Sequence, residues 1–306
     1  MKNRAFIAGV LLLAATGAFA GRAGEAPPPT RWSRWTEIDG ADVHYLDTAP
    51  GSDLPVLLVL PGFLGSTATF VPMADALSRE MRVVIPDLPG FGWSETPNGG
   101  CTMDDRIAFV DAFADRLDLG PVHLAGSSLG ANIAVRFAVA NPGRVKSLVL
   151  LSPFGLQGQR DAVSRLERFD RLLPFVTLFA GRRMLARELG KQVRDPSELT
   201  RGILESFRRP FRSAAGRRVV VAVSRNILYG SFFDEYLPRV TQPTLVVAGS
   251  DDSYRRPDTL GVLESRIPSC TALLLEGCRH MIQLDAPAEV AGMLARFCAA
   301  TAGLEP

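Results

Sequence analysis

The residue best suited to chemistry is Ser128, which occupies the centre of a Gly-x-Ser-x-Gly pattern between Gly126 and Gly130. An apolar segment at residues 122–125 precedes the pattern, and a helix-forming segment follows it. A serine on so sharp a turn is strained and needs small neighbours, and the helix that starts there directs free N–H groups at a developing negative charge. The pattern alone occurs by chance in many chains, but its position between a strand and a helix predicts a serine nucleophile.

A serine hydroxyl is a weak nucleophile that needs a general base, and the sequence offers only His44, His123 and His280. His44 and His123 lie in segments with the pattern of strands, which indicates packed or solvated structural histidines. His280 comes just after the last apolar run. Its imidazole can therefore project from the same sheet edge as Ser128, and we predict that His280 is the base.

The imidazole in turn needs a carboxylate that holds its tautomer and stabilises the imidazolium. Asp251 and Asp252 both follow the apolar run that precedes His280. Asp252 is preferred, because the turn at residues 249–251 lets the strand end before the acid points back. Asp251 stays open as the alternative. The expected order along the chain is Ser128, Asp252, His280.

Short apolar runs alternate with segments of helical period, which is typical of a parallel sheet covered by helices. The predicted fold class is α/β, with a mostly parallel eight-stranded sheet flanked by helices. We expect strands at residues 36–38, 43–46, 56–60, 82–85, 122–125, 145–151, 244–248 and 271–275. We expect helices at residues 70–79, 104–117, 129–140, 259–266 and 286–299.

The alternation stops between Pro153 and Val240, where Arg-rich, helix-prone sequence is broken by prolines and glycines. Residues 155–240 contain 17 Lys and Arg against 9 Asp and Glu, a net +8 in a chain whose formal net charge is +2. We interpret residues 154–240 as an inserted helical cap or lid, and residues 31–153 together with 241–306 as the core.

The predicted cap contains an uninterrupted apolar run at residues 172–180, flanked by Arg171 on one side and by Arg182 and Arg183 on the other. Two interpretations stay open. The run lines an acyl pocket or touches a lipid surface, with the arginines near anionic headgroups, or it is buried against the core while the arginines are solvated. Membrane-surface contact is expected only under the first interpretation.

The first 20 residues have the order of a secretory signal, with Lys2 and Arg4, an apolar run at residues 5–15, and Ala-Phe-Ala ending at Ala20. The run is shorter than the roughly 20 residues that span a bilayer. We predict cleavage after Ala20, a linker at residues 21–30, and export to the periplasm or the medium. An uncleaved anchor is the alternative.

Export would place all four cysteines, Cys101, Cys270, Cys278 and Cys298, in an oxidising compartment. An even number permits up to two disulfides. A bridge between Cys270 and Cys278 is disfavoured, because a strand of about six residues separates their backbones by more than the roughly 7 Å that a disulfide allows. Free and mostly buried thiols are the alternative. Neither a Cys-x-x-Cys nor a Cys/His cluster suggests a metal, and the small net charge gives no argument for nucleic acid.

Three segments resemble the α/β-hydrolase superfamily, and more narrowly bacterial secreted esterases and lipases with a helical cap. They are the Gly-x-Ser-x-Gly elbow, the Leu-Pro-Gly-Phe-Leu-Gly-Ser loop at residues 60–66, and the Asp-Leu-Pro-Gly-Phe-Gly-Trp-Ser segment at residues 87–94. The resemblance implies an oxyanion hole made by the backbone N–H groups of Phe63 and Leu129. Pro61 stands where the usual pattern has His, which removes a side-chain hydrogen bond and a backbone donor but leaves the Phe63 N–H.

Haloalkane dehalogenases and epoxide hydrolases of this superfamily resemble one another in carrying aspartate at the elbow, so Ser128 disfavours both activities. The resemblance and the three side chains predict a cofactor-free hydrolase that cleaves small-molecule or lipid esters with an apolar acyl group, through an acyl-enzyme on Ser128. Acyl transfer, lactone opening, peroxidation and C–C bond hydrolysis by the same residues are alternatives. A non-catalytic ligand-binding relative is a further one.

Overall fold

The computed structural model describes residues 30–97, 101–156, 177, 181–229, 232–301 and 303. The predicted signal peptide and nearly all of the predicted linker lie outside the described residues, as does the apolar run of the predicted cap except for Thr177. Among the residues that are described, no helix is both long enough and apolar enough to cross a membrane.

Eight strands form one sheet in the order β1-β2-β4-β3-β5-β6-β7-β8. β2 pairs antiparallel with both β1 and β4, and each neighbouring pair from β4 across to β8 is parallel. The strands are β1 (Ser33–Ile38), β2 (Ala41–Asp47), β3 (Val56–Leu60), β4 (Arg82–Pro86), β5 (Val122–Ser127), β6 (Val145–Leu151), β7 (Thr244–Gly249) and β8 (Cys270–Leu275). The predicted fold class and all eight predicted strands are confirmed.

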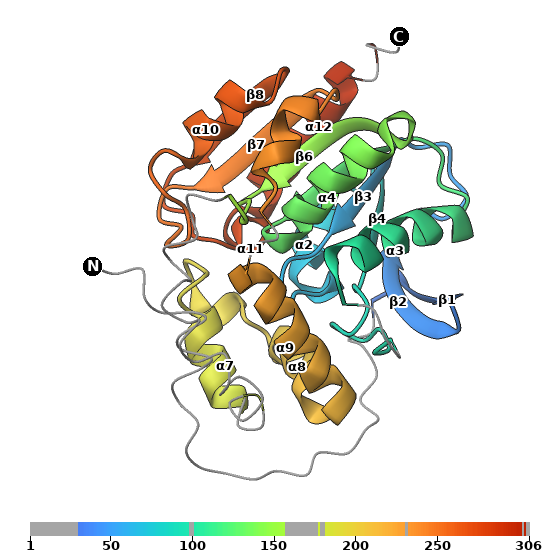
Figure 1. The fold of residues 1–306 in the computed structure, drawn as a ribbon, viewed down its shortest axis with the longest axis vertical. Helices are drawn as coiled ribbons and strands as arrows, with labels where there is room; N and C mark the ends of the chain where they lie inside the picture. Colours follow the sequence, from blue (N-terminus) through green and yellow to red (C-terminus); the bar gives the residue numbers. More distant parts are fainter. Residues whose placement is uncertain are drawn as a thin grey trace.

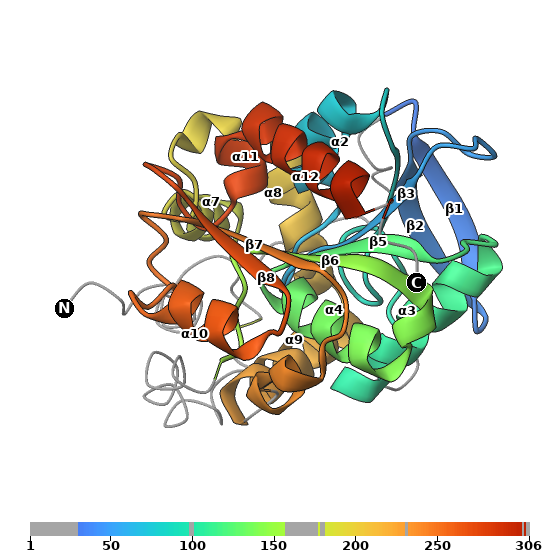
Figure 2. The ribbon, with the colours of Figure 1, turned by 90° about the horizontal axis from the view of Figure 1, so that it is seen from above.

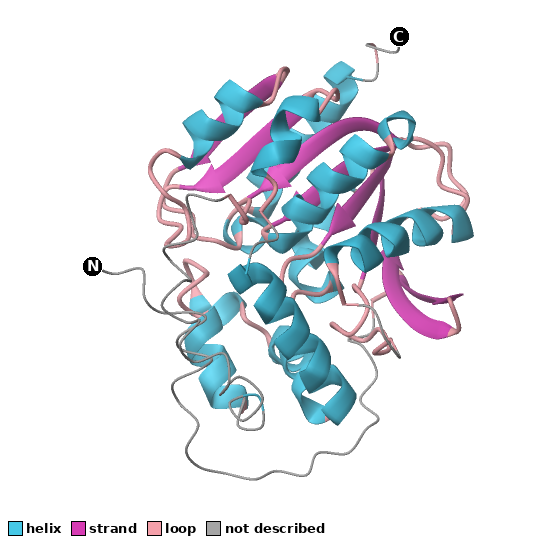
Figure 3. Cartoon of the chain, in the orientation of Figure 1, coloured by secondary structure: helices cyan, strands magenta, loops and turns pink. Residues whose placement is uncertain are grey.

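Helices cover both faces of this single layer of strands (Figures 1 and 3). One face carries α2 (Val71–Leu77), α11 (Ile282–Asp285) and α12 (Pro287–Thr301), and the other carries α3 (Met103–Arg116), α4 (Leu129–Ala140) and α10 (Thr259–Arg266), as Figure 2 shows. A short 3-10 helix, η1 (Thr67–Phe70), leads into α2.

Each central strand contributes to two hydrophobic cores, because neighbouring residues of a strand face opposite sides of the sheet. Leu58 and Leu60 of β3 belong to the core that includes α3 and α4. Leu57 and Val59 belong to the core that includes α2 and α12. All four side chains are fully buried. Strands buried on both faces are apolar throughout, which is why they were readable as short apolar runs.

Between β6 and β7 the described chain forms helices and no strands. It contains α7 (Arg182–Leu189), η5 (Pro196–Glu198), α8 (Arg201–Arg208), η6 (Arg209–Arg212), α9 (Ala214–Tyr229) and η7 (Asp234–Arg239). We call the described residues 181–239 the helical insertion; its helices α7, α8 and α9 lie below the sheet in Figure 1. Ile203 and Phe207 of α8 are buried. The insertion packs closely on the rest of the described chain, which we call the body, because a Cβ on Gly90 of the body would come within 2.8 Å of Val219 of α9.

All four cysteines are free thiols, with Cys278 and Cys298 buried and the other two partly buried. Cys270 and Cys278 are therefore unbridged, as the length of β8 predicted. Burial raises the pKa of Cys298 to about 12 and that of Cys270 to about 11.

Candidate active site

Ser128 forms a strained turn between β5 and α4. Its φ of 53° and ψ of −114° lie outside the conformations that a residue with a side chain prefers. Such a conformation costs on the order of 1–3 kcal/mol and persists only where the surroundings impose it. Here the Ser128 N–H donates to the carbonyl oxygen of Leu151, at the end of β6, over 2.9 Å.

The two glycines of the elbow are required by close packing. A Cβ on Gly126 would lie 2.2 Å from the carbonyl oxygen of Gly130, and a Cβ on Gly130 would lie 2.0 Å from that of Leu60. The first turn of α4 therefore presses directly on the ends of β3 and β5. This contact places Ser128 at the carboxyl edge of the sheet.

His280 lies in the loop after β8, and its Nδ1 is 2.8 Å from Oδ2 of Asp252. The second carboxylate oxygen of Asp252 accepts the backbone N–H of Tyr254 over 2.8 Å, and the Asp252 side chain is buried. Asp251 is exposed, and its carboxylate accepts the hydroxyl of Ser250. The structure thus brings Asp252, and not Asp251, to the imidazole.

Ser128 and His280 line the same cavity of about 70 Å³. The structure has no hydrogen bond between these two side chains, and catalytic hydrogen bonds often tighten only when substrate is bound. Most of the wall is apolar or aromatic. The lining includes Phe63, Phe70, Leu129, Phe154, Phe207, Tyr254 and Met281, together with Gln192 and Gln283.

The two predicted oxyanion donors also border this cavity. Leu129 is the first residue of α4, where an N–H has no partner within the helix. Within the described part of the chain, the N–H of Phe63 donates no hydrogen bond. A turn closed by the Gly65 N–H and the Gly62 carbonyl, 3.0 Å apart, shapes this loop. The loop lies close to Ser128 despite Pro61, because a Cβ on Gly62 would be 3.1 Å from the Cβ of Ser128.

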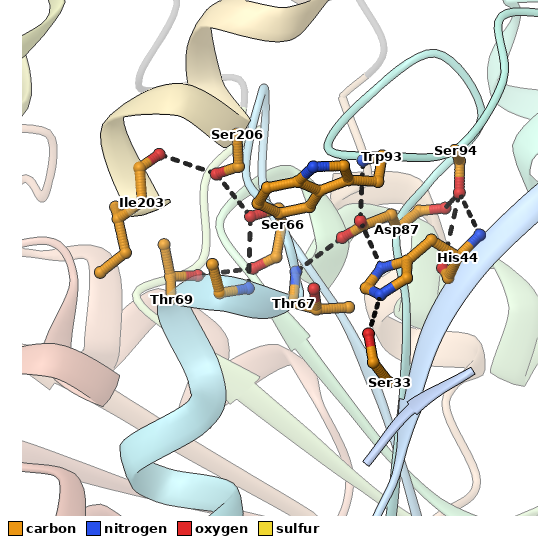
Figure 4. Close-up of polar contacts among 11 residues, drawn as sticks. Ser33, His44, Ser66, Thr67, Thr69, Asp87, Trp93, Ser94, Ile203 and Ser206 are labelled. Carbon is orange, nitrogen blue, oxygen red and sulfur yellow. Dashed lines mark hydrogen bonds and ion pairs between the residues drawn. The ribbon is translucent and has the colours of Figure 1, made fainter. Parts of the chain in front are cut away.

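The loop at residues 60–66, which contains Phe63 and which we call the oxyanion loop, is held by hydrogen bonds at its carboxyl end (Figure 4). The Thr67 N–H donates to Oδ1 of the buried Asp87 over 2.7 Å, and the hydroxyl of Ser66 donates to that of Ser206 in α8 over 2.7 Å. Ser206 in turn donates to the carbonyl of Ile203. One end of the loop is therefore fixed to the body and to the helical insertion together.

The His280 loop is fixed in the same manner from two sides. Asp285 of α11 accepts the backbone N–H of Arg279 over 2.6 Å and that of Arg194 over 2.7 Å. The N–H of Met281 donates to the carbonyl oxygen of Gln192, which belongs to the helical insertion, over 3.0 Å. The residues on both sides of the imidazole are thereby tied down.

Sequence reasoning missed Tyr254, whose ring packs edge-on against His280 with 4.7 Å between the ring centroids. Burial, and then the negative charges of Asp252 and Glu188, raise the pKa of Tyr254, so the phenol stays neutral. Phe154 contacts the same tyrosine ring. These residues lie in irregular loops that carry no periodic or motif signal.

The other two histidines do not line this cavity. His44 is buried with Nδ1 2.9 Å from Oδ2 of Asp87, and His123 is buried with Nδ1 2.8 Å from the hydroxyl of Ser147. Burial, and then the charge of Lys146, lower the pKa of His123 to about 4. Within the described ranges, no cluster of three His, Cys, Asp or Glu side chains forms a metal site.

The sequence model of the alpha/beta hydrolase fold matches residues 55–287, which is more than half of the 306-residue chain. The chain belongs to the α/β-hydrolase fold family. Ser128, Asp252 and His280 follow β5, β7 and β8 of this α/β-hydrolase, at the carboxyl ends of parallel strands.

Characterised relatives of this α/β-hydrolase catalyse different reactions. Haloalkane dehalogenase 2 of Mycobacterium tuberculosis is 28% identical over 273 residues, which cover 86% of this chain and 93% of that protein. Human monoacylglycerol lipase ABHD6 is 24% identical over 257 residues, covering 80% and 75%. The 2-hydroxy-6-oxo-2,4-heptadienoate hydrolase of Pseudomonas putida is 26% identical over 254 residues, covering 80% and 88%.

Among solved structures, a bacterial membrane phospholipase A has the same fold, with a TM-score of 0.75 and 23% identity over 88% of this chain and 86% of that one. The family and these relatives support a hydrolase of the α/β fold.

Proposed function

We propose that this protein hydrolyses carboxylic esters with an apolar acyl group, through an acyl-enzyme on Ser128. The main support is the buried pair of His280 and Asp252, 2.8 Å apart, on a cavity that also contains Ser128 and the two candidate oxyanion donors. A base, a nucleophile and donors for a developing oxyanion are the three requirements of acyl transfer.

The geometry suggests the following mechanism. Ser128 Oγ attacks the ester carbonyl carbon while Nε2 of His280 takes the hydroxyl proton, and Asp252 stabilises the imidazolium. The oxyanion accepts the N–H groups of Phe63 and Leu129. The C–O bond breaks, and the alcohol leaves with the proton from His280. Water then attacks the acyl-enzyme with His280 as base, which releases the acid and restores Ser128.

A serine nucleophile argues against the reaction of the dehalogenase relative. Displacement of a halide from a saturated carbon by Ser128 would form an ether, which water does not cleave with the help of an imidazole. Attack on a carbonyl forms an ester, which water does cleave. The nucleophile therefore favours carbonyl substrates.

The wall of the cavity favours an apolar acyl group. Phe63, Phe154, Phe207 and Met281 line the space around Ser128. Each methylene buried against such a wall contributes about 0.8 kcal/mol. Activity should therefore rise with acyl length until the cavity is filled.

Hydrolysis of a C–C bond is the second candidate, because one relative is a hydrolase of an oxo-heptadienoate. A dienoate carries a carboxylate, which a site usually binds with a cation. None of the described residues that line the cavity is Lys or Arg. This lining favours a neutral ester over an anionic substrate.

We further propose, from the sequence, that the protein is exported and contacts a membrane surface. The order of charge, apolar run and small residues at positions 1–20 supports a cleaved signal. Sequencing of the amino terminus of the mature protein tests it, and an intact Met1 would contradict cleavage.

The function is tested with p-nitrophenyl esters of increasing acyl length and with a fluorophosphonate probe. We expect turnover by the wild type and covalent labelling of Ser128. Ser128→Ala should lose both, whereas Ser127→Ala, altered at the adjacent position, should keep the label. His280→Ala should lose several orders of magnitude in kcat while it stays folded. A folded wild type that neither turns over any ester nor takes the label would instead support a binding protein.

A further inference from the structure

A second serine, histidine and aspartate are joined by hydrogen bonds at a distinct place in the fold (Figure 4). The hydroxyl oxygen of Ser33 is 2.6 Å from Nε2 of His44, and Nδ1 of His44 is 2.9 Å from Oδ2 of Asp87. We call these residues the second triad. His44 is 1% exposed and Asp87 is fully buried, whereas Ser33 is partly exposed.

The surroundings fix the tautomer of His44. A carboxylate only accepts, so Nδ1 carries the proton that it donates to Asp87, and Nε2 is left to accept the hydroxyl proton of Ser33. The ring is held between Trp35 and Trp93, with centroids 5.1 and 5.8 Å away. The imidazole is thus oriented as a base toward Ser33.

The second triad borders its own cavity. Ser33 and His44 line a space of about 210 Å³ between the body and α8, and neither Ser128 nor His280 lines it. The wall is largely apolar, with hydroxyl groups among it. The apolar lining includes Leu46, Val71 and Ile203, and the hydroxyl residues Thr30 and Thr200 and the acidic Glu198 also line the space. A small electrophile with apolar substituents fits such a space.

The donors near Ser33 differ from those near Ser128. The N–H groups of Ser33, Thr67 and Ala68 already donate to other protein oxygens, so they are not available as an oxyanion hole. Within the described part of the chain, the hydroxyl of Thr30 is buried without a partner, and the hydroxyl oxygen of Thr200 accepts one hydrogen bond, from the N–H of Ile203. Hydroxyl groups, not backbone amides, would therefore meet a developing negative charge.

We propose that Ser33 is a second reactive serine, which is modified once by a small apolar acyl or phosphonyl compound instead of turning it over. With a fluorophosphonate, Ser33 Oγ forms a bond to phosphorus, the P–F bond breaks and fluoride leaves. Nε2 of His44 takes the hydroxyl proton, and Asp87 balances the charge of the imidazolium. Because the N–H groups of Ser33, Thr67 and Ala68 are already engaged, the oxyanion is poorly stabilised, so attack is slow and the adduct persists.

The test uses the folded Ser128→Ala protein and a short-chain alkyl fluorophosphonate, with intact mass and peptide mapping as readouts. We expect one adduct per chain at Ser33, formed at least about 100-fold more slowly than the Ser128 adduct of the wild type. The double variant Ser33→Ala with Ser128→Ala should form none. Ser265, a serine of α10 exposed to solvent, serves as the internal control for unspecific reaction.

A further variant separates activation by His44 from mere accessibility of Ser33. His44→Asn, combined with Ser128→Ala, keeps an amide near Asp87 but removes the base at Nε2, and it should abolish the Ser33 adduct while circular dichroism shows a folded protein. Labelling of Ser265 at the same rate as Ser33, or no Ser33 adduct in folded Ser128→Ala, would overturn the proposal. If the wild type is labelled at Ser128 in that second case, the ester hydrolase proposal stands and only the second triad fails.

Discussion

Two adjacent carboxylates in this chain have different surroundings. Asp252 is buried and contacts Nδ1 of His280, whereas Asp251 is exposed and contacts Ser250. A neutral amide at position 252 would no longer hold the imidazole in the required tautomer or stabilise its charged form. We expect Asp252→Asn to lower kcat on p-nitrophenyl esters by about 10⁴-fold. Asp251→Asn, the matched control, should stay within about threefold of the wild type; equal losses in both variants would contradict the assignment.

Gly249, at the end of β7, sits directly behind the His280 loop. A Cβ at this position would lie 2.2 Å from the carbonyl oxygen of Cys278 and 2.4 Å from that of Arg279. We expect Gly249→Ala to push the loop outward, with a loss of about 2–4 kcal/mol in the free energy of unfolding and a large loss in kcat. Denaturant unfolding and ester turnover measure the two effects.

Gly261 of α10 is the control for this substitution, because nothing lies within 4 Å of the Cβ that Gly261→Ala would add. Alanine is a better helix former than glycine, so this variant should gain about 0.5–1 kcal/mol of stability and keep its kcat. A Gly249→Ala protein as stable and active as Gly261→Ala would show that the loop yields to the methyl group.

Single residues were predictable where chemistry restricted the choice. One serine in a Gly-x-Ser-x-Gly pattern, three histidines and two adjacent aspartates left few combinations, and the structure joins His280 to Asp252. Tyr254 and Asp285 were not predictable, because their contacts with the His280 loop arise only in the folded chain. Ser33 was missed for the same reason: its partner is a histidine on the neighbouring strand.

At the scale of elements, predictability followed the clarity of the local sequence pattern. The predicted bounds of β3, β6, α4 and α10 coincide with those in the structure, because apolar runs and helical periods are clear there. β1 begins at Ser33, before the predicted residue 36, because this edge strand is half exposed and its apolar pattern is weak. The predicted helix at residues 70–79 is a 3-10 turn followed by a shorter α2, which ends at Leu77.

The loop after β8, which carries His280, is held in place by the short helix α11, which was not predicted from the sequence. Asp285 accepts the N–H groups of Arg279 and Arg194, and an asparagine has only one oxygen to offer. We expect Asp285→Asn to loosen the loop and to lower kcat by about 10–100-fold while KM changes little, because misplacement of a catalytic group by about 1 Å is costly. Steady-state kinetics on a short ester measure this split.

Asp258→Asn provides the comparison for Asp285→Asn, since among the described residues the Asp258 carboxylate pairs with Arg256 alone, on the surface. It should match the wild type in kcat and KM. A rise in KM with unchanged kcat in Asp285→Asn would indicate a role in binding instead of in holding His280.

At the scale of the whole molecule, one segment separates the two cavities. Thr69 and Phe70 line the cavity of Ser128, whereas Thr67 and Ala68, on the same short helix, line the cavity of Ser33. Asp87 links this helix to the second triad, because its carboxylate accepts hydrogen bonds both from the N–H of Thr67 and from Nδ1 of His44. The second triad therefore supports the oxyanion loop whether or not Ser33 reacts.

Stability of the whole molecule should depend on the protonation of His123. Burial of the imidazole, and then the charge of Lys146, lower the pKa of His123 to about 4. An unfolded histidine has a pKa of about 6.5. Between these values the unfolded chain binds a proton that the folded chain does not, so the free energy of unfolding falls as pH falls from about 6.5 to 4. This group alone should remove about 2–3 kcal/mol between pH 7 and 4.5.

His123→Asn tests this dependence, because an amide can keep a hydrogen bond to Ser147 without titrating. The variant should be less stable than the wild type at pH 7, since it loses ring contacts in the core, but its free energy of unfolding should fall less steeply toward pH 4.5. Urea unfolding of both proteins at a series of pH values isolates the histidine, because every other titrating group is common to the two. Parallel curves would mean that His123 is protonated in the folded protein as readily as in the unfolded chain, and would contradict the prediction.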